Sequence, residues 1–142
     1  MRRAGVPGTS GLDAALAAVG DRWSLRIVQV LLGGPQRFGE LQSSVEGIAS
    51  NVLTQRLRRL EAARVVVARP YTARPPRVAY ELTASGQRLA GALRLLSSWG
   101  AGQPDGAAPT HVACGTALDA RWWCPTCGTE VEDPGGEALI HL

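Results

Sequence analysis

Apolar side chains recur at helical spacing along the first part of the chain. Leu12, Ala15, Leu16 and Val19 stand at i, i+3, i+4 and i+7, which is the spacing of one helix face. The next apolar stretch is hydrophobic on most sides, which predicts a central helix, and Asp21 precedes it as a candidate cap. The whole pattern predicts helices over residues 12–19, 22–32, 37–45 and 51–63.

The hydrophobic period then changes to the alternation typical of strands. Residues 65–71 are rich in β-branched side chains, and apolar and polar side chains alternate over residues 77–83. Between them, residues 72–76 read TARPP, which predicts a turn that its prolines keep out of any sheet interior. A final helix is expected over residues 84–99. Two short helices joined by a tight turn and followed by a hairpin predict a winged helix-turn-helix, mainly α with a β-hairpin wing.

The helix predicted over residues 51–63 has two distinct faces. Leucines form its apolar stripe, and Ser50 precedes it as the expected N-cap. The opposite stripe suits contact with base edges in a major groove, because Asn and Gln pair with adenine, Arg pairs with guanine, and Thr meets a thymine methyl or a phosphate. The side chains of this stripe are Asn51, Thr54, Gln55 and Arg58.

Basic side chains surround this helix in the sequence. Arg74 and Arg77 lie in the predicted hairpin, with Arg69 nearby, and they suit phosphate or minor-groove contact across a wing of residues 69–77. Arg37, at the start of the preceding helix, is a further candidate for holding the DNA backbone. The alternative is an ordinary solvated helix face. The roles of Arg56 and Arg59 stay open between DNA contact and pairing with an acid of the domain.

Charge separates the chain into a basic body and an acidic tail. Residues 1–100 contain 14 arginines and six acids, a net charge of +8, whereas residues 101–142 contain one arginine and six acids, a net charge of −5. A basic body favours a polyanionic partner, which here means double-stranded DNA. The codon bias of a GC-rich genome would explain the absence of lysine, but it would not explain the imbalance between arginines and acids.

Four metal-ligating side chains follow the body at regular spacing. His111, Cys114, Cys124 and Cys127 read H-x2-C-x9-C-x2-C, which is typical of a tetrahedral Zn²⁺ site in a zinc ribbon. Four protein ligands leave no open position, so one structural zinc per chain and no catalysis are expected. Trp122 and Trp123 would cover the metal, pack on the main domain, or line a pocket for a small-molecule effector.

Two other readings of the C-terminal region remain open. The CPTC pair is also found in thiol oxidoreductases, although about 32 residues cannot supply the βαβ surroundings that those enzymes have. A zinc-containing adaptor that binds another protein through its acidic tail is the second alternative. The expected organisation is a flexible arm over residues 1–10, a DNA-binding and dimerisation domain over 11–100, a linker over 101–110 and a zinc module over 111–142.

Targeting signals are not visible in the sequence. No apolar run approaches the roughly 20 residues of a membrane span, and acidic residues interrupt any signal-peptide core. Three cysteines are an odd count, which disfavours a framework of disulfides. We therefore expect a cytoplasmic protein that does not meet a membrane.

Three stretches of the chain are similar to a known family. ALAAVGDRWSLRIVQVLLGGPQRFGELQ (15–42), GIASNVLTQRLRRLEAARVV (47–66) and PPRVAYELTASGQRL (75–89) resemble the HxlR-type winged-helix transcription regulators of bacteria over about residues 11–100. The resemblance implies a homodimer built from the first and last helices, and a pseudo-palindromic operator. It also places Asn51, Thr54, Gln55 and Arg58 on a recognition helix, and Arg74 and Arg77 on the wing.

The chain departs from that family at three points. Many members begin the recognition helix with Ser-Pro, where this chain has Ala49 and Ser50. Many have glycine after the helix, where this chain has Arg64. Several sense oxidants through a cysteine near the first helix, but this chain has no cysteine before Cys114, so that mechanism is not transferred to it.

Overall fold

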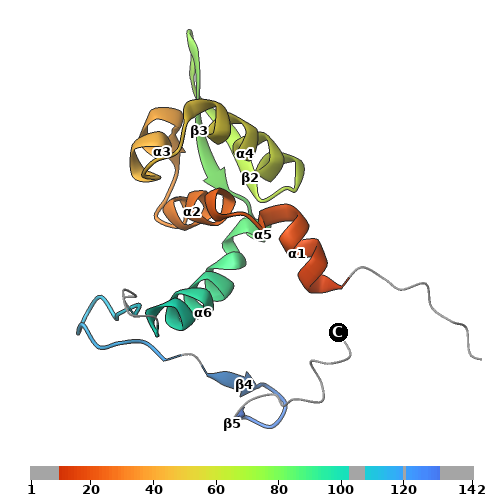
Figure 1. Ribbon diagram of the computed structural model, residues 1–142, viewed down its shortest axis with the longest axis vertical. Helices are drawn as coiled ribbons and strands as arrows, with labels where there is room; N and C mark the ends of the chain where they lie inside the picture. Colours follow the sequence, from red (N-terminus) through yellow and green to blue (C-terminus); the bar gives the residue numbers. More distant parts are fainter. Residues whose placement is uncertain (1–9, 103–107, 120, 132–142) are drawn as a thin grey trace, which may run out of the picture. The chain divides into compact units, whose positions relative to one another are not determined.

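The computed structural model describes residues 10–102, 108–119 and 121–131 of the chain (Figure 1). These residues form two compact units, one spanning Leu12–Leu93 and one containing the C-terminal part from Arg94 onward. Nearly all of the expected N-terminal arm, half of the expected linker and the acidic tail lie outside the described residues, at 1–9, 103–107 and 132–142.

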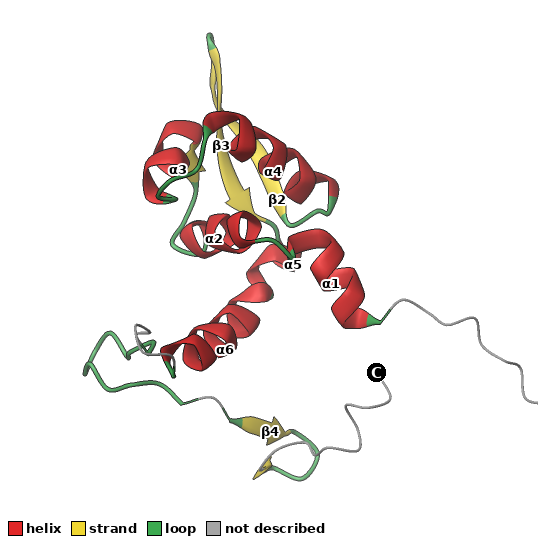
Figure 2. Cartoon of the chain, viewed as in Figure 1, coloured by secondary structure: helices red, strands yellow, loops and turns green. Residues whose placement is uncertain are grey.

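Helices at the predicted places build most of the first unit (Figure 2). Asp21 caps the second helix as expected, because its carboxylate accepts the backbone N–H groups of Trp23 at 3.1 Å and Ser24 at 2.9 Å. The predicted cap Ser50 is wrong by one residue. Ala49 is the N-cap, in extended conformation and without a side-chain hydrogen bond, and Ser50 is already helical. The helices are α1 (Gly11–Val19), α2 (Arg22–Leu31), α3 (Phe38–Ser44) and α4 (Ser50–Ala62).

The second helix lies at the centre of the hydrophobic core. Ile27, Val28 and Leu31 are buried almost completely, as expected for a helix that is apolar on most sides. Each large side chain buried in this way contributes about 1.5–3 kcal/mol. The other helices and the sheet supply the remaining core residues, namely Val19, Leu41, Val45, Ile48, Leu53, Leu57, Leu60, Val65, Val66 and Leu82.

A three-stranded antiparallel sheet of order β1-β3-β2 completes the winged domain. Strand β1 (Gln36–Arg37) pairs with β3 (Pro76–Leu82) and was not predicted, because two residues are too few to show a period. The predicted turn over residues 72–76 is too long. Strand β2 (Val66–Ala73) continues to Ala73, which faces Pro76, so only Arg74 and Pro75 connect the strands. Pro70 is tolerated in β2 because β2 is an edge strand and its register shifts after this residue.

The predicted helix over residues 84–99 is divided into two. Helix α5 (Ala84–Gln87) ends at Arg88, and α6 (Leu89–Ala101) follows at once. Gly86 lies so close to the sheet that a Cβ atom there would stand 2.2 Å from the carbonyl oxygen of Val65. Leu89 and Leu93 pack against the core, but α6 contains no fully buried residue. Like the other helices of the described ranges, α6 is not long and apolar enough to cross a membrane.

The C-terminal unit contains a small hairpin of β4 (Trp122–Cys124) and β5 (Thr129–Val131). The guanidinium of Arg121 lies beside two carboxylates of this unit. Arg121 Nη1 lies 3.0 Å from both carboxylate oxygens of Glu130, and Arg121 Nε lies 3.4 Å from Asp119. Within residues 108–119 and 121–131 no side chain is fully buried, so this part of the unit has no hydrophobic core.

Candidate nucleic-acid interface

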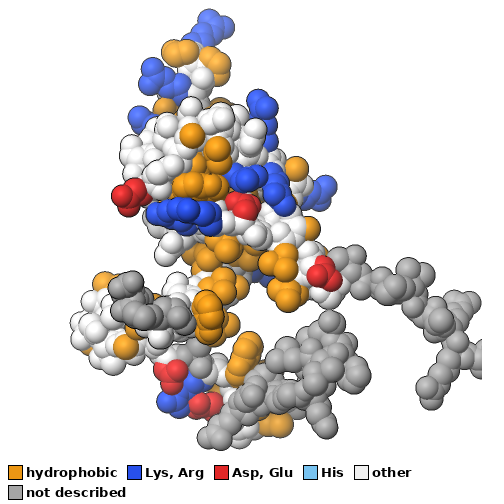
Figure 3. Space-filling view, viewed as in Figure 1, with side chains coloured by type: hydrophobic (Ala, Val, Ile, Leu, Met, Phe, Trp, Pro, Cys, Tyr) orange, Lys and Arg blue, Asp and Glu red, His pale blue; other side chains and the backbone are white. Residues whose placement is uncertain are grey.

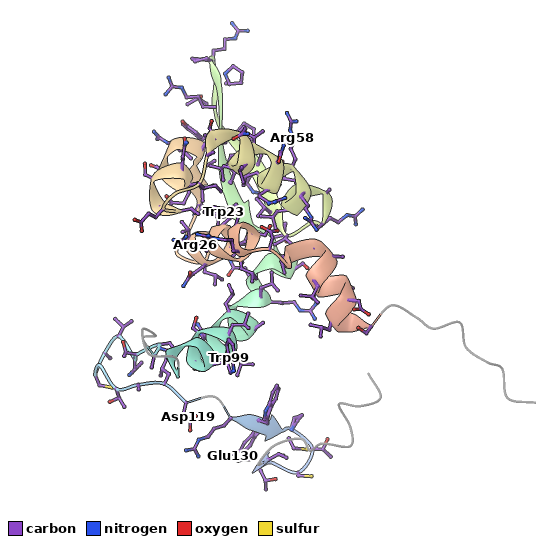
Figure 4. All side chains as sticks on the ribbon, viewed as in Figure 1. Trp23, Arg26, Arg58, Trp99, Asp119 and Glu130 are labelled. Atoms are coloured by element: carbon purple, nitrogen blue, oxygen red, sulfur yellow. The ribbon has the colours of Figure 1, made fainter. Side chains whose placement is uncertain are left out.

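The fourth helix presents the polar face that its sequence predicts. Leu53, Leu57 and Leu60 are turned into the core, with exposed fractions of 0–2%. Asn51, Gln55 and Arg58 are exposed on the other side, and Figure 4 shows Arg58 pointing away from the domain. The helix therefore offers two amide side chains and one guanidinium to any partner that lies along it.

Thr54 is less available than its position in the stripe suggests. Its hydroxyl donates a hydrogen bond of 2.9 Å to the backbone carbonyl of Ser50, one turn earlier. The hydroxyl proton is therefore used inside the helix, whereas the methyl group and an oxygen lone pair remain. This leaves a methyl contact, or acceptance of a hydrogen bond, as the interactions that Thr54 can offer.

The two arginines whose roles the sequence left open both pair with Asp21. Arg56 Nε lies 3.2 Å from one carboxylate oxygen of Asp21, and Arg59 Nη1 lies 4.0 Å from the other. Arg59 also donates a hydrogen bond to the carbonyl of Ala17. These contacts place Arg56 and Arg59 against the domain, on a different side of α4 from Arg58.

The hairpin of β2 and β3 presents cationic side chains near its tip. Arg74 and Arg77 are exposed, and arginines (blue) gather on the hairpin and over α4 in Figure 3. Thr72 braces the connection by donating a hydrogen bond of 2.7 Å from its hydroxyl to the Pro75 carbonyl. Arg69 is different, because it pairs with Glu81 on the neighbouring strand. This pairing leaves Arg74 and Arg77 as the main cations near the tip.

Arg37 lies where the third helix meets the base of the hairpin. Its backbone N–H donates a hydrogen bond of 2.7 Å to Glu40, and its guanidinium lies 4.7 Å from the centre of the Tyr71 ring. A guanidinium stacked on a ring keeps its N–H edge available for a phosphate. Sequence reasoning missed Tyr71. An aromatic residue inside a basic hairpin was the signal that would have drawn attention to it.

The four predicted zinc ligands form two pairs in the C-terminal unit. His111 Nδ1 lies 3.2 Å from Cys114 Sγ, and the Cys127 backbone N–H lies 3.5 Å from Cys124 Sγ. The structure does not bring the two pairs into one cluster, since the described residues contain no group of three or more His, Cys, Asp or Glu side chains arranged for a metal.

Two of these thiols, the exposed Cys114 and the half-buried Cys124, have hydrogen bonds that favour the thiolate. Hydrogen bonding with Thr116, and then with His111, lowers the pKa of Cys114. Backbone and side-chain contacts with Cys127 lower the pKa of Cys124. Trp122 and Trp123, for which the sequence leaves open a place over the metal, on the main domain or in a pocket, are 54% and 65% exposed.

Comparison with known proteins places the domain in a family. The model for the HxlR-like helix-turn-helix family matches residues 18–106. The uncharacterized HTH-type transcriptional regulator Rv3095 of Mycobacterium tuberculosis is 36% identical over 122 residues, which are 82% of this chain and 77% of that protein.

Solved structures agree with this assignment. The crystal structure of the HTH-type transcriptional regulator YtcD, a Bacillus subtilis protein, is 39% identical, with a TM-score of 0.62 over 66% of this chain and 95% of that chain. PA1607 is 28% identical, with a TM-score of 0.73 over 89% of this chain and 92% of that chain. With its fold, its polar helix face and these matches together, the chain belongs to the HxlR-like helix-turn-helix family.

Proposed function

We propose that this DNA-binding transcription regulator of the HxlR-like family recognises a pseudo-palindromic operator as a homodimer. Helix α4 would enter the major groove, and the β2–β3 hairpin would lie on the flanking backbone. The observation that carries the proposal is the exposed face of α4, with Asn51, Gln55 and Arg58 directed away from a core that Leu53 and Leu57 anchor. A major groove about 12 Å wide accommodates such a helix.

The proposal divides the arginines by role. Arg58 would pair with guanine, and Asn51 and Gln55 with adenine, so these side chains would determine the sequence preference. Arg37, Arg74 and Arg77 would contact phosphates, which fixes orientation and adds affinity without reading the bases. Ser50 and Thr54, at the start of α4, would contact the backbone or a thymine methyl.

Exposed apolar side chains on the first and last helices support the homodimer. Leu12 and Leu16 on α1 are 68% and 53% exposed, and Leu96 and Trp99 on α6 are 51% and 73% exposed. Large apolar side chains on two helices are costly to leave in water, and a twofold partner would bury them. Such a dimer would present two α4 helices, about 34–36 Å apart, to successive major grooves.

The alternative functions have less support. A thiol oxidoreductase would use Cys124 and Cys127, but these thiols lie in an isolated hairpin, and the family match covers a DNA-binding motif. A protein-binding adaptor would depend on the acidic tail and would leave the polar face of α4 unexplained. A regulator without enzymatic activity accounts for α4 and the hairpin together.

Fluorescence anisotropy with DNA from upstream of the protein's own gene tests this function. Arg58→Ala and Gln55→Ala should each cost about 1–3 kcal/mol of binding free energy and relax the preference at one operator position. Arg74→Ala should weaken binding to every sequence alike and lower the salt slope by about one unit.

Arg88→Ala is the matched control, because Arg88 is an exposed arginine between α5 and α6, away from α4. It should bind like the parent. If the three interface variants also bind the operator as tightly as the parent, the proposed reading face is wrong.

A further inference from the structure

Two turns in the C-terminal unit have the same backbone construction. In the first, the N–H of Gly115 donates a hydrogen bond of 2.7 Å to the carbonyl of His111. In the second, the N–H of Gly128 donates one of 2.9 Å to the carbonyl of Cys124. Gly115 and Gly128 both have left-handed backbones, with φ values of 71° and 65°. Each turn therefore starts at one predicted ligand, ends at a second, and closes on a glycine that tolerates positive φ.

This shared construction places two ligand atoms side by side in each turn. His111 Nδ1 and Cys114 Sγ are 3.2 Å apart. Two ligands of a tetrahedral zinc, with bond lengths of about 2.3 Å to sulfur and about 2.0–2.1 Å to nitrogen, lie about 3.5 Å apart. In the first turn, the distance between the two ligand atoms is thus already close to the one that a tetrahedral zinc requires.

The second turn offers its sulfur atoms in a comparable setting. The N–H of Cys127 points at Cys124 Sγ from 3.5 Å, and such backbone donors stabilise a thiolate.

Residues 108–119 and 121–131 have few contacts that stabilise their folded arrangement. Val112, Trp122 and Trp123 are all more than half exposed, and no side chain of residues 108–119 and 121–131 is fully buried. Among the described residues, the ordering contacts are a bridge between Thr110 and Ala117, backbone hydrogen bonds within the two turns, a hairpin of three-residue strands, and exposed ion pairs of Arg121. Exposed ion pairs contribute little, so the ordering entropy of about 25 residues needs another stabilising contribution.

We propose that one Zn²⁺ ion supplies this stabilising contribution by joining the two turns through His111, Cys114, Cys124 and Cys127. The structure presents the ligands as two preformed pairs, and the metal would draw them into one tetrahedron. Nine residues separate Cys114 from Cys124, which is enough chain for the turns to meet at a small closure cost. Once one turn holds the ion, the second binds within the same molecule at a high effective concentration.

Such a site is structural. One neutral imidazole and three thiolates fill all four positions of the ion, so no position remains for a substrate or an activated water. The inference is independent of the proposed DNA recognition, because every ligand lies outside the winged domain.

The test is a cobalt titration of the full chain, purified reduced and freed of metal with a chelator. Co²⁺ in a tetrahedral site with three sulfur ligands gives intense visible bands and a thiolate charge-transfer band in the near ultraviolet. The bands should saturate at one equivalent, and Zn²⁺ should then abolish them. Cys114→Ser and Cys124→Ser, one from each turn, should each weaken Co²⁺ binding on the order of a hundredfold or more.

Thr126→Ala is the matched control, because Thr126 lies between Cys124 and Cys127 and offers no ligand. It should titrate like the parent. The proposal is overturned if the parent gives no charge-transfer band, or if Cys114→Ser binds as tightly as the parent, since the first turn would then contribute nothing. It is also overturned if Cys124 and Cys127 form a disulfide in air equally fast with and without zinc.

Discussion

Arg56 on α4 and Asp21 at the N-terminus of α2 form an ion pair, with Nε 3.2 Å from the nearer carboxylate oxygen. The same carboxylate caps α2 through the backbone N–H groups of Trp23 and Ser24. One acid therefore fixes the start of the central helix and the position of the proposed recognition helix. Because α4 uses Arg56 and Arg59 for this contact, only its other face is left for DNA.

This division predicts different consequences for two arginines that are two residues apart. Arg56→Ala should lower the free energy of unfolding by about 0.5–1 kcal/mol, as expected for a partly exposed ion pair, and should leave the salt slope of DNA binding unchanged. Arg58→Ala should lower the salt slope of DNA binding and leave the free energy of unfolding within about 0.5 kcal/mol of that of the parent. Urea unfolding and salt-dependent anisotropy measure the two effects. A salt slope reduced by Arg56→Ala would place Arg56 on the DNA.

Asp21 should make the stability of the domain depend on acid pH. Burial raises the pKa of Asp21, but hydrogen bonds from Ser24 and the charge of Arg56 outweigh it, so the pKa lies below its ordinary value. A lowered folded-state pKa adds stability that is fully present above the unfolded-state value of about 3.9 and is lost as the pH falls through the folded-state pKa.

Asp21→Asn separates charge from capping, because asparagine is also a good N-cap. At pH 7 this variant should be less stable than the parent, and the difference should shrink as the pH falls below about 4. Asp21→Ala should lose the cap as well, at a further cost of about 1 kcal/mol. Thermal unfolding between pH 3 and pH 7 measures both. A difference between Asp21→Asn and the parent that is constant with pH would refute the ion-pair contribution.

Arg64 takes the position where many relatives have glycine, and the structure shows the conformational cost. Its φ is 58°, in the left-handed region. The N–H groups of Arg64 and Val65 donate to the carbonyls of Glu61 and Leu60, which is the hydrogen-bond pattern of a Schellman motif. Arg64→Gly should raise the free energy of unfolding by up to about 1 kcal/mol, because it removes the Cβ penalty. Arg64→Ala, which keeps the Cβ atom, should not, and equal stability of the two variants would contradict the strain.

We predict that position 86 requires glycine because the neighbouring backbone leaves no room for a side chain, and not because of its own backbone conformation. A Cβ atom there would meet the Val65 carbonyl oxygen at 2.2 Å, whereas one at Gly91 in α6 would meet nothing within 4 Å. Gly86→Ala should therefore destabilise the domain by about 1–3 kcal/mol. Gly91→Ala should be neutral or stabilising by up to about 1 kcal/mol, as alanine is the better helix former. Chemical denaturation measures the free energy of unfolding of both variants. If Gly86→Ala leaves it unchanged, α5 can shift to make room for the Cβ atom.

The proposed dimer predicts that apolar residues of α6 control the oligomeric state. Trp99→Glu should shift the chain towards monomer at micromolar concentration, since Trp99 is 73% exposed and the proposed partner would bury it. Gln29→Glu adds the same charge to an exposed position of α2 and serves as the control. Sedimentation velocity distinguishes them. A parent protein that sediments only as monomer while binding DNA would rule out the dimer.

The elements that the sequence predicted well are those with long periods and clear caps. Helix α2 is the clearest case. Asp21 marks its start, and apolar side chains on most of its sides predict that it lies in the core. The exposed stripe of α4 was also visible, since three leucines at helical spacing determine which side faces outward. Both predictions depend on local periodicity, which a single sequence carries.

The features that were missed depend on contacts distant in sequence. Strand β1 is only two residues long and exists because β3 pairs with it. The apolar helical pattern continues through Arg88, so the sequence does not show that the helix is divided there. Nor does that pattern show the close approach of Gly86 to Val65. Likewise, the partner of Arg56 lies 35 positions earlier in the chain, at Asp21, so only the folded structure could assign it.

The contact of Arg37 with Tyr71 has a consequence for how the operator is chosen. Strand β1 pairs with the middle of β3, the Arg37 guanidinium lies over the Tyr71 ring nearer the tip, and Thr72 braces the connection. A surface fixed in this way loses little conformational entropy in the complex. In the proposed complex, the double helix would be the more compliant partner and would have to bend or narrow its groove to fit. Stiffness and flexibility of individual base steps would therefore influence affinity, even at operator positions that no side chain touches.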